Sequence, residues 1–229
     1  MLPAVTGSDG IARAAAAAAA VELVEPAMTI GLGSGRAVWK VVDLLGARED
    51  PFRAATASNR TAERAVQAGI EIVELDGDLE LDLALDGADE VGPSLGLIKG
   101  GGGALLREKI VISAARRFVV VAETPKRVER LGEHRRLPVE VVRFAWRDTR
   151  RRLARLLPDA ELRMDADAPY VTDEGHYLLD CRIPEGADPA ELDQALKRVP
   201  GVVEHGLFLG MAERALLGRP DGGVDVLTA

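Results

Sequence analysis

Four consecutive glycines, Gly100 to Gly103, separate Lys99 from a predicted helix in the stretch LIKGGGGALLREK, residues 97–109. Each glycine costs about 0.5–1 kcal/mol relative to alanine in a regular element, so a run of four needs a reason. Exposed backbone N–H groups at a helix N-terminus, aided by the helix dipole, can bind a phosphate or a sugar. Lys99 supplies a cation, and Glu108 supplies a carboxylate inside the helix. A flexible loop, with Glu108 paired to a surface lysine, is the alternative.

Three carboxylates lie within five residues in Asp86-Gly87-Ala88-Asp89-Glu90, directly after an alternating strand pattern. A helix cap with a solvated turn is one alternative explanation, and a metal site is another. A metal ion needs more ligands than this stretch offers. The three histidines, His134, His176 and His205, lack paired spacing. The sequence therefore predicts no metal.

The stretch Gly31-Leu32-Gly33-Ser34-Gly35-Arg36 joins a predicted strand to a predicted helix. Its glycines leave N–H groups free at a helix N-terminus, which favours an anion. It lacks the lysine and spacing of a nucleotide P-loop and differs from the dinucleotide fingerprint. Ser34 is not in a nucleophile elbow, because Leu32 stands where that motif needs glycine. The stretch indicates an anion-binding loop, with a tight strand-to-helix turn as the alternative.

Together the three stretches indicate acid–base chemistry. Asp86 and Asp89 would raise the proton affinity of Glu108, and Lys99 would limit that increase. Such a carboxylate can remove a proton next to a carbonyl group, and a cation can stabilise the resulting enediolate oxygen. This chemistry requires no redox cofactor, Schiff-base partner or covalent nucleophile. The residues therefore predict proton abstraction α to a carbonyl on a small phosphorylated molecule, without a cofactor.

Strands and helices alternate from residue 10 to about 131, and this order must position the three stretches. We expect strands at 29–33, 52–58, 70–75, 81–87 and 118–123, and helices at 36–45, 59–69 and 104–117, with Ser58 or Asn59 as the cap of the second helix. Such alternation predicts a mostly parallel sheet covered on both faces. Ligands of such sheets bind beyond the carboxyl ends of the strands, where all three stretches fall.

The pattern changes after residue 136. The expected elements are a strand at 137–142, a basic helix at 146–157, a strand at 160–164, a hairpin at 170–183 turning at residues 173–175, a helix at 188–199 and a strand at 201–208. This β-α-β-β-α-β order is typical of a ferredoxin-like unit. We therefore predict an α/β protein: a Rossmann-like catalytic domain of residues 1–132 and 204–229, with a smaller inserted ferredoxin-like α+β domain of residues 133–203.

Composition excludes several classes of protein. The 229 residues include 29 lysines and arginines against 37 aspartates and glutamates, and the net charge of −8 disfavours nucleic acid or an anionic membrane as a partner. A single cysteine, Cys181, excludes an internal disulfide and fits a reducing cytoplasm. No run is long enough for a membrane span, and the alanine-rich segment before Pro26 is expected to be a helix. We predict a cytoplasmic protein with a small-molecule substrate.

Several motifs are similar, in order and spacing, to those of the ribose-5-phosphate isomerase A family: DGADEV, LIKGGGGALLREKIV, VVVAETPKRVERLG, LPVEVV and PGVVEHGLFLGMAE. The likeness extends from the N-terminal helix to about Leu217. The resemblance implies cofactor-free interconversion of ribose 5-phosphate and ribulose 5-phosphate through an enediol, in the pentose phosphate pathway. It also implies a Rossmann-like domain with a ferredoxin-like insertion, and a homodimer or a tetramer.

The resemblance further implies roles for single residues. Glu108 matches the general base that moves the proton between C1 and C2, and Lys99 matches the lysine that stabilises the oxyanion. Asp86 and Asp89 match carboxylates that bind the sugar and assist ring opening and hydroxyl proton transfer. The expected substrate-binding residues also include Gly87, Ala88, Gly100, Gly101, Gly102 and Lys126.

The first loop departs from the family pattern, which is usually Gly-Ser/Thr-Gly-Ser-Thr. Here it is Gly33-Ser34-Gly35-Arg36-Ala37, so the last two hydroxyl groups, which hold the phosphate in the family, are absent. We expect residues Ser34, Gly35, Arg36 and Ala37 to bind substrate, with the charged fork of Arg36 as a candidate replacement. Arg13 stands where a lysine is common and would add a charge.

Two alternative functions are a non-catalytic sugar-phosphate sensor and an enzyme of another sugar phosphate, such as an amino-sugar-phosphate deaminase. The negative net charge is unhelpful to a sensor that regulates transcription. The complete KGGGGALLREK stretch disfavours the deaminase.

Overall fold

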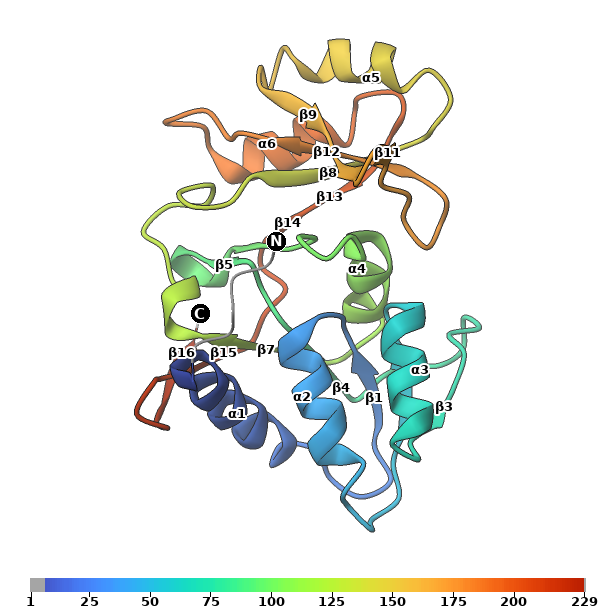
Figure 1. Cartoon of the computed structure of the whole chain (residues 1–229), viewed down its shortest axis with the longest axis vertical. Coiled ribbons are helices and arrows are strands. Elements are labelled where there is room, and N and C mark those ends of the chain that lie inside the picture. Colours follow the sequence, from blue (N-terminus) through green and yellow to red (C-terminus); the bar gives the residue numbers. More distant parts are fainter. Residues whose placement is uncertain (1–6, 229) are drawn as a thin grey trace.

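The larger part of the protein is a seven-stranded sheet with the strand order β16-β15-β7-β4-β1-β2-β3 (Figure 1). The computed structural model describes residues 7–228, so residues 1–6 and 229 of the predicted catalytic domain lie outside the described residues. Neighbouring strands are parallel except for β15 and β16, so the predicted mostly parallel sheet is confirmed. The strands are β1 Thr29–Leu32, β2 Arg53–Thr56, β3 Glu71–Ile72, β4 Leu83–Asp86, β7 Phe118–Glu123, β15 Arg214–Gly218 and β16 Val224–Thr228.

Helices cover both faces of this sheet. On one face, α1 (Gly7–Val21), α2 (Arg36–Leu45) and α3 (Asn59–Gln67) pack alanine, valine and leucine side chains onto the central strands. On the other face, α4 (Leu105–Ser113) contributes Val111 and Ile112. The central strands β4 and β7 consist mainly of apolar residues because both of their faces are buried. Ser58 caps α3 by accepting a hydrogen bond from the Thr61 N–H, so of the two predicted caps, Asn59 and Ser58, Ser58 is correct.

Three short antiparallel strands lie against the second face: β5 (Glu90–Val91), β6 (Leu97–Ile98) and β14 (Leu207–Phe208). The sequence did not predict β5 or β6, and the strand expected at 201–208 is two strands, β13 (Val202–His205) and β14. The break falls at Gly206, where the chain passes between two sheets. A Cβ there would lie 2.2 Å from the Lys99 carbonyl oxygen, so this close approach requires glycine.

The smaller part of the protein contains a four-stranded antiparallel sheet with the order β13-β8-β12-β9. Its elements follow the chain as β8 (Leu137–Val141), α5 (Trp146–Leu153), β9 (Ala160–Leu162), β12 (Tyr177–Cys181), α6 (Pro189–Leu196) and β13. Figure 1 shows this sheet and its helices at one end of the molecule, next to the loops that precede α4. The smaller sheet therefore borders the edge where strands of the large sheet end.

Several predicted elements are shorter than expected. The strand expected at 70–75 is reduced to β3, and the helix expected at 104–117 ends at Ser113. Beyond that point Ala114 and Arg116 hydrogen-bond to Leu81 in a bridge with the large sheet. The strand expected at 160–164 divides into β9 and β10 (Met164–Asp165), which pairs with β11 (Ala168–Pro169).

The hairpin expected at 170–183 turns at residues 173–175 as predicted, and there the Thr172 N–H donates to the His176 carbonyl oxygen, but the first arm forms no strand. An isolated bridge between Val171 and Tyr177 joins the two arms, and β12 pairs with β8 and β9. Segment 170–176 is therefore free of the sheet ladder and extends toward α3 and α4. Among residues 7–228, no helix combines the length and hydrophobicity that crossing a membrane requires.

Candidate active site

Asp86 and the turn after β1 meet because their strands are neighbours. Parallel strands place their carboxyl ends at one edge of the sheet, so Asp86 at the end of β4 lies beside Gly33 and Ser34. The Ser34 N–H donates to Asp86 Oδ1 over 3.1 Å. A Cβ on residue 33 would lie 1.8 Å from Asp86 Cγ, so only glycine allows this approach.

Lys99 is buried between two carboxylates. Its Nζ atom lies 2.8 Å from Asp86 Oδ2 and 3.3 Å from Glu108 Oε2, and it donates to the Gly87 carbonyl oxygen over 2.6 Å. The side chains of Lys99, Asp86 and Glu108 are only 2%, 1% and 5% exposed. A buried charge is costly unless it is paired, so these three groups stabilise one another.

The two carboxylates differ in their hydrogen bonds. Asp86 Oδ1 accepts from the N–H groups of Ser34 and Gly87, which favour the ionised form. Asp86 Oδ2 and Glu108 Oε2 are both buried with only the ion pair to Lys99, but no backbone N–H group among the described residues donates to the Glu108 carboxylate. Burial and the negative charge of Asp86 raise the pKa of Glu108 to about 8, although Lys99 opposes this shift. Glu108 is therefore the carboxyl group placed to exchange a proton at mildly alkaline pH.

The charge of Lys99 depends on the same balance. Burial alone would lower the pKa of its ammonium group, but the negative charges of Asp86 and Glu108 outweigh burial and raise that pKa. Burial raises the pKa of Asp86, against the effects of Lys99 and the two N–H groups. We therefore assign Lys99 as a cation and Asp86 as its partner anion, because Asp86 has the shorter contact and more hydrogen-bond donors.

Asp89 holds the glycine loop from the other side. Its Oδ2 atom accepts a hydrogen bond from the Gly101 N–H over 2.7 Å. Asp89 and Gly101 line a cavity of about 540 Å³, together with Pro138, Glu161 and Asp180 of the smaller sheet and with Arg135 and Arg163 beside it. This cavity borders the site at Asp89 and does not reach Glu108 or Lys99. Asp89 is thus the candidate acid–base residue that faces open space.

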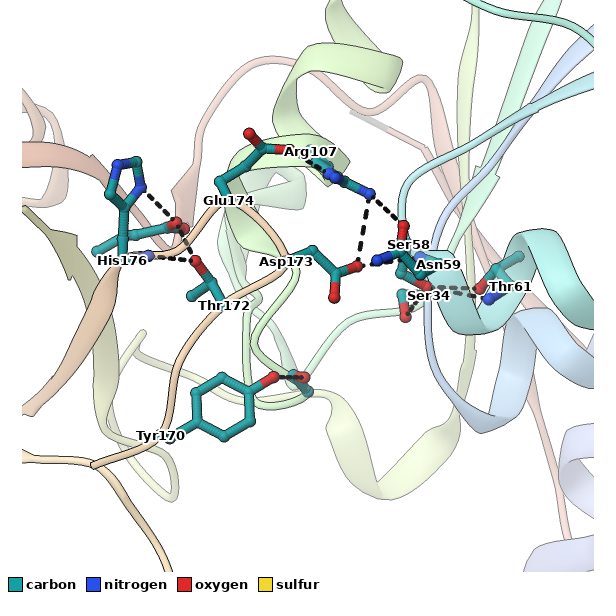
Figure 2. A network of polar contacts seen from close by, with 12 residues as sticks. Ser34, Ser58, Asn59, Thr61, Arg107, Tyr170, Thr172, Asp173, Glu174 and His176 are labelled. Carbon is teal, nitrogen blue, oxygen red and sulfur yellow. Dashed lines mark hydrogen bonds and ion pairs between the residues drawn. The ribbon is translucent and has the colours of Figure 1, made fainter. Parts of the chain in front are cut away.

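The predicted phosphate loop lies at the N-terminus of α2. Helix α2 begins at Arg36 after Gly35, and no side chain caps its first N–H groups, so they remain available to an anion. The Ser34 hydroxyl lies 3.0 Å from the Ser58 hydroxyl, which donates to Thr61 (Figure 2). Ala37 faces Gly87 across the site.

Lys126 and Arg36 supply unpaired positive charge near this loop. Lys126 follows β7 in a short 3₁₀ helix (Thr124–Lys126), and neither side chain makes a hydrogen bond or ion pair with any of residues 7–228. Burial lowers the pKa of Lys126, Arg135 and Arg36 lower it further, and Asp89 and Glu123 oppose the shift. Arg36 and Arg135 therefore lie close enough to Lys126 for their positive charges to lower its pKa.

Arg13 is placed differently from the expectation. Its Nη2 atom lies 2.6 Å from Glu123 Oε1, and both side chains are largely buried. The charge of Arg13 is thus compensated within the protein, at the strand end that leads to Lys126. Its role as a direct substrate ligand stays a prediction.

Sequence reasoning missed the residues that hold the glycine loop. Arg163 donates to the carbonyl oxygens of Gly100 and Gly101 over 3.0 and 3.1 Å. The Tyr170 hydroxyl donates to the Gly102 carbonyl oxygen over 3.3 Å (Figure 2). These contacts join residues more than sixty positions apart, so no local pattern marks them.

The residues of the site form no recognisable metal centre. No set of three or more histidine, cysteine, aspartate or glutamate side chains within residues 7–228 is arranged to hold a metal ion. His134, His176 and His205 lie next to Glu133, Glu140 and Asp193 respectively.

Comparisons with known proteins identify the family of the chain. Residues 53–222 match the family model described as ribose 5-phosphate isomerase A (phosphoriboisomerase A). The chain is 50% identical to the ribose-5-phosphate isomerase A of Roseiflexus castenholzii, over 95% of this chain and 96% of that protein. It is 46% identical to that of Gloeobacter violaceus, again over 95% and 96%.

Solved structures give the same result. The ribose 5-phosphate isomerase A of Methanocaldococcus jannaschii is 35% identical with a TM-score of 0.91, covering 96% of this chain and all of that one. A D-ribose-5-phosphate isomerase in complex with phospho-erythronic acid is 34% identical with a TM-score of 0.90, covering 95% of this chain and 97% of that one. The chain belongs to the ribose 5-phosphate isomerase A family.

Proposed function

We propose that this chain interconverts D-ribose 5-phosphate and D-ribulose 5-phosphate by moving a proton between C1 and C2 through an enediolate. The observation that carries the proposal is Glu108, whose pKa is raised to about 8 and whose Oε2 atom lies 3.3 Å from the ammonium group of Lys99. A general base is most efficient when its pKa is near the working pH. A fixed cation beside it stabilises an oxyanion as the charge develops.

In the aldose-to-ketose direction, Glu108 removes the proton from C2 of the open-chain sugar. The electron pair of that bond forms the C1–C2 double bond, and the C1 carbonyl oxygen gains negative charge that Lys99 stabilises. The C1 oxygen then takes up a proton, and the C2 hydroxyl loses one as its carbonyl group forms. Glu108 returns its proton to C1. Asp86 and Asp89 assist ring opening and these hydroxyl proton transfers.

The phosphate binds, in this proposal, at the uncapped N-terminus of α2. Ser34, Gly35, Arg36 and Ala37 form this end of the site, and Lys126 supplies a second cation. Arg36 is exposed at the start of α2 and has no partner among the described residues, so its guanidinium group is free to form paired hydrogen bonds with phosphate oxygens. Arg13, which pairs with Glu123, stays a predicted substrate ligand at this end of the site. The remaining sugar contacts are assigned to Gly87, Ala88, Gly100, Gly101 and Gly102.

The complex of the 34% identical isomerase supports an enediolate mechanism. Phospho-erythronic acid combines a phosphate with a carboxylate on a sugar chain. A carboxylate is planar and spreads negative charge over two oxygens, which are also the properties of an enediolate. Ligands that resemble a reaction's high-energy state bind tightly to the groups that stabilise it. In this proposal, Lys99 is the group that stabilises the enediolate in this chain.

The proposal includes an organisation of the whole chain. Residues 1–132 and 204–229 form the catalytic, Rossmann-like domain, and residues 133–203 form the inserted ferredoxin-like domain. The chain order of β8, α5, β9, β12, α6 and β13 supports this division. A cytoplasmic homodimer needing no cofactor completes the proposal. Phe144, which is 89% exposed on the smaller part, is a candidate dimer contact.

Turnover in deuterium oxide tests both the reaction and its path. Purified protein is mixed with ribose 5-phosphate, and proton NMR follows the sugar. We expect ribulose 5-phosphate to form and deuterium to enter at C1 of the ketose and C2 of the aldose, because the proton on Glu108 exchanges with solvent. Binding without turnover would support a sensor instead. Turnover of an amino-sugar phosphate alone, with release of ammonia, would support a deaminase.

A further inference from the structure

The first turn of α4, which carries Glu108, is held from outside through Arg107. The Arg107 guanidinium group donates from Nε to Glu174 Oε1 over 2.5 Å and from Nη1 to Asn59 Oδ1 over 2.8 Å. Its Nη1 atom also lies 3.5 Å from Asp173 Oδ2, which accepts a hydrogen bond from the Asn59 N–H (Figure 2). Helix α3, helix α4 and segment 170–176 therefore meet at one side chain.

Segment 170–176, which we call the strap, is itself anchored at two places. Buried Glu140 of β8 accepts a hydrogen bond from the Thr172 hydroxyl over 2.8 Å and lies 3.0 Å from His176 Nδ1. Tyr170 donates to the carbonyl oxygen of Gly102 in the glycine loop. The strap thus extends from the smaller sheet to the glycine loop and to α4, as Figure 2 shows. Arg107 is held by a segment that is fixed to the smaller sheet.

Helix α4 does not stabilise its own N-terminus. Its N-cap residue is Ala104, which offers no side-chain cap, and the glycine run 100–103 precedes it. The Glu108 N–H donates to the Ala104 carbonyl oxygen, so Glu108 lies at the first intrahelical hydrogen bond. An uncapped helix end depends on its neighbours for a fixed position. Arg107 is the residue adjacent to Glu108 that makes such contacts.

We propose that Arg107 is a positioning residue for the isomerase. Held by Asp173 and Glu174 of the strap, it fixes the first turn of α4 so that the Glu108 carboxylate faces Lys99 and the substrate. This inference rests on the proposed function. Arg107 acts through Glu108 and not on the sugar, because its contacts are directed at Asn59 and the strap.

The exposure of these groups distinguishes positioning from general stabilisation. The side chains of Arg107, Asp173 and Glu174 are 31%, 35% and 43% exposed. Ion pairs this accessible to water contribute little to stability. A displacement of about 1 Å in a catalytic group can nevertheless lower the rate by about 10²-fold. Loss of Arg107 should therefore change catalysis much more than it changes the unfolding temperature.

The test compares Arg107→Ala, Arg107→Lys and the double variant Asp173→Asn/Glu174→Gln with the unmodified protein. We expect Arg107→Ala to lower kcat by about 10- to 10²-fold with a nearly unchanged KM. Arg107→Lys should restore part of the rate, because an ammonium group can pair with one strap carboxylate. The strap variant should lower kcat as much as Arg107→Ala does. Combining all three substitutions should lower kcat little further.

The pH profile supplies a readout that a purely structural role would not move. Burial raises the pKa of Glu108, so a first turn that admits water should lower it. The rising limb of kcat/KM against pH should therefore move to lower pH in Arg107→Ala. Arg116→Ala is the matched control, because it removes an exposed ion pair with Glu80 just beyond the other end of α4. This control should leave kcat and the limb unchanged.

Two results would overturn the positioning role. One is a normal kcat and pH limb in Arg107→Ala with a lower unfolding temperature, which would make Arg107 purely structural. The other is a raised KM with an unchanged kcat, which would make it a substrate ligand. The unmodified protein is assayed in parallel. If the unmodified protein lacks turnover, the proposed function is contradicted. If the unmodified protein and Arg107→Ala are equally active, only the positioning role of Arg107 is contradicted.

Discussion

Lys99 contacts two carboxylates that the protein treats differently. Asp86 is held by two backbone N–H groups and by the shorter contact with Lys99, so its ionised form is supported from several sides. Glu108 has one longer contact with Lys99, and no backbone N–H group among the described residues donates to its carboxylate. Burial and the negative charge of Asp86 therefore raise the pKa of Glu108. Asp86 itself stays the anion that pairs with Lys99, so it does not compete with Glu108 for the role of base. Titratable groups with environments this different can have separate acid–base roles.

The pH dependence of Glu108 can be tested directly. Its pKa is raised to about 8, so it becomes an ionised base only as the pH rises through that value. We expect kcat/KM to rise with pH across this range. Glu108→Gln keeps the shape but removes the base, so kcat should fall by roughly 10²–10⁴-fold and the rising limb should disappear. Initial rates of ribose 5-phosphate isomerisation between about pH 6 and pH 10 measure both effects.

A surface variant controls for general effects of losing a carboxylate. Glu213 pairs with Arg117 at the start of β7. The variant Glu213→Gln should retain both kcat and the rising limb of kcat/KM against pH. If Glu108→Gln kept near-normal turnover, or kept the same limb at a reduced rate, another group would be the base.

At the scale of elements, local patterns predict the central strands and helices but not the connections between them. Strand β7 was predictable because FVVVAE is a continuous apolar run, and α3 because Ser58 precedes a helical pattern. The two-residue strands β3, β5 and β6 are too short for any periodicity to appear. Their positions are set by pairing partners that lie elsewhere in the chain.

The site was predictable to a similar extent. Asp86, Asp89, Lys99 and Glu108 were visible because acid, base and cation lie within 23 residues. Arg163 and Tyr170 were not, because their contacts with the glycine loop are made across the fold. The turn of the strap at residues 173–175 was predictable from its turn residues, but the local pattern does not show that the first arm forms no strand and contacts α3 and α4 instead.

The turn between β1 and α2 allows a prediction at this scale. Gly33→Ala would place a Cβ 1.8 Å from Asp86 Cγ, so Asp86 would have to move away from Lys99. We expect a destabilisation of about 1–3 kcal/mol from overpacking and a reduced kcat. Urea unfolding and steady-state kinetics measure the two effects. Gly10→Ala in α1 is the matched control, because a Cβ there meets nothing within 4 Å. Equal behaviour of the two variants would contradict the required close approach.

At the scale of the whole molecule, the four-stranded sheet and the three-stranded sheet of β5, β6 and β14 share a hydrophobic cluster. The cluster beneath the smaller sheet includes Leu137, Val139, Leu179 and Leu192, and it also includes Ile98, Val128, Leu131 and Leu207. The second group lies outside residues 133–203, so the proposed domain boundary passes through a continuous core. Neither part can bury this surface alone. Lys99 lies at this junction, since its N–H donates to the Gly206 carbonyl oxygen between the two sheets.

A shared core predicts that both parts unfold together, and the two tryptophans of the chain can report on this separately. Trp39 lies in α2 beside the large sheet, and Trp146 lies in α5, packed edge-on against Tyr177 of the smaller one. In urea, Trp39→Phe leaves only the Trp146 signal, and Trp146→Phe leaves only that of Trp39. We expect the fluorescence midpoint of each variant to coincide with its own circular dichroism midpoint.

Comparing two probes within one variant removes the effect of the substitution on stability. An independently folded insertion would instead lose the Trp146 signal in a transition separate from loss of the parallel sheet. Such a result would mean that Ile98, Val128, Leu131 and Leu207 do not couple the two parts, despite their place in the common cluster. Coincident midpoints would mean that the smaller sheet cannot unfold without releasing β6. Because Lys99 directly follows β6, its position would be lost in the same transition.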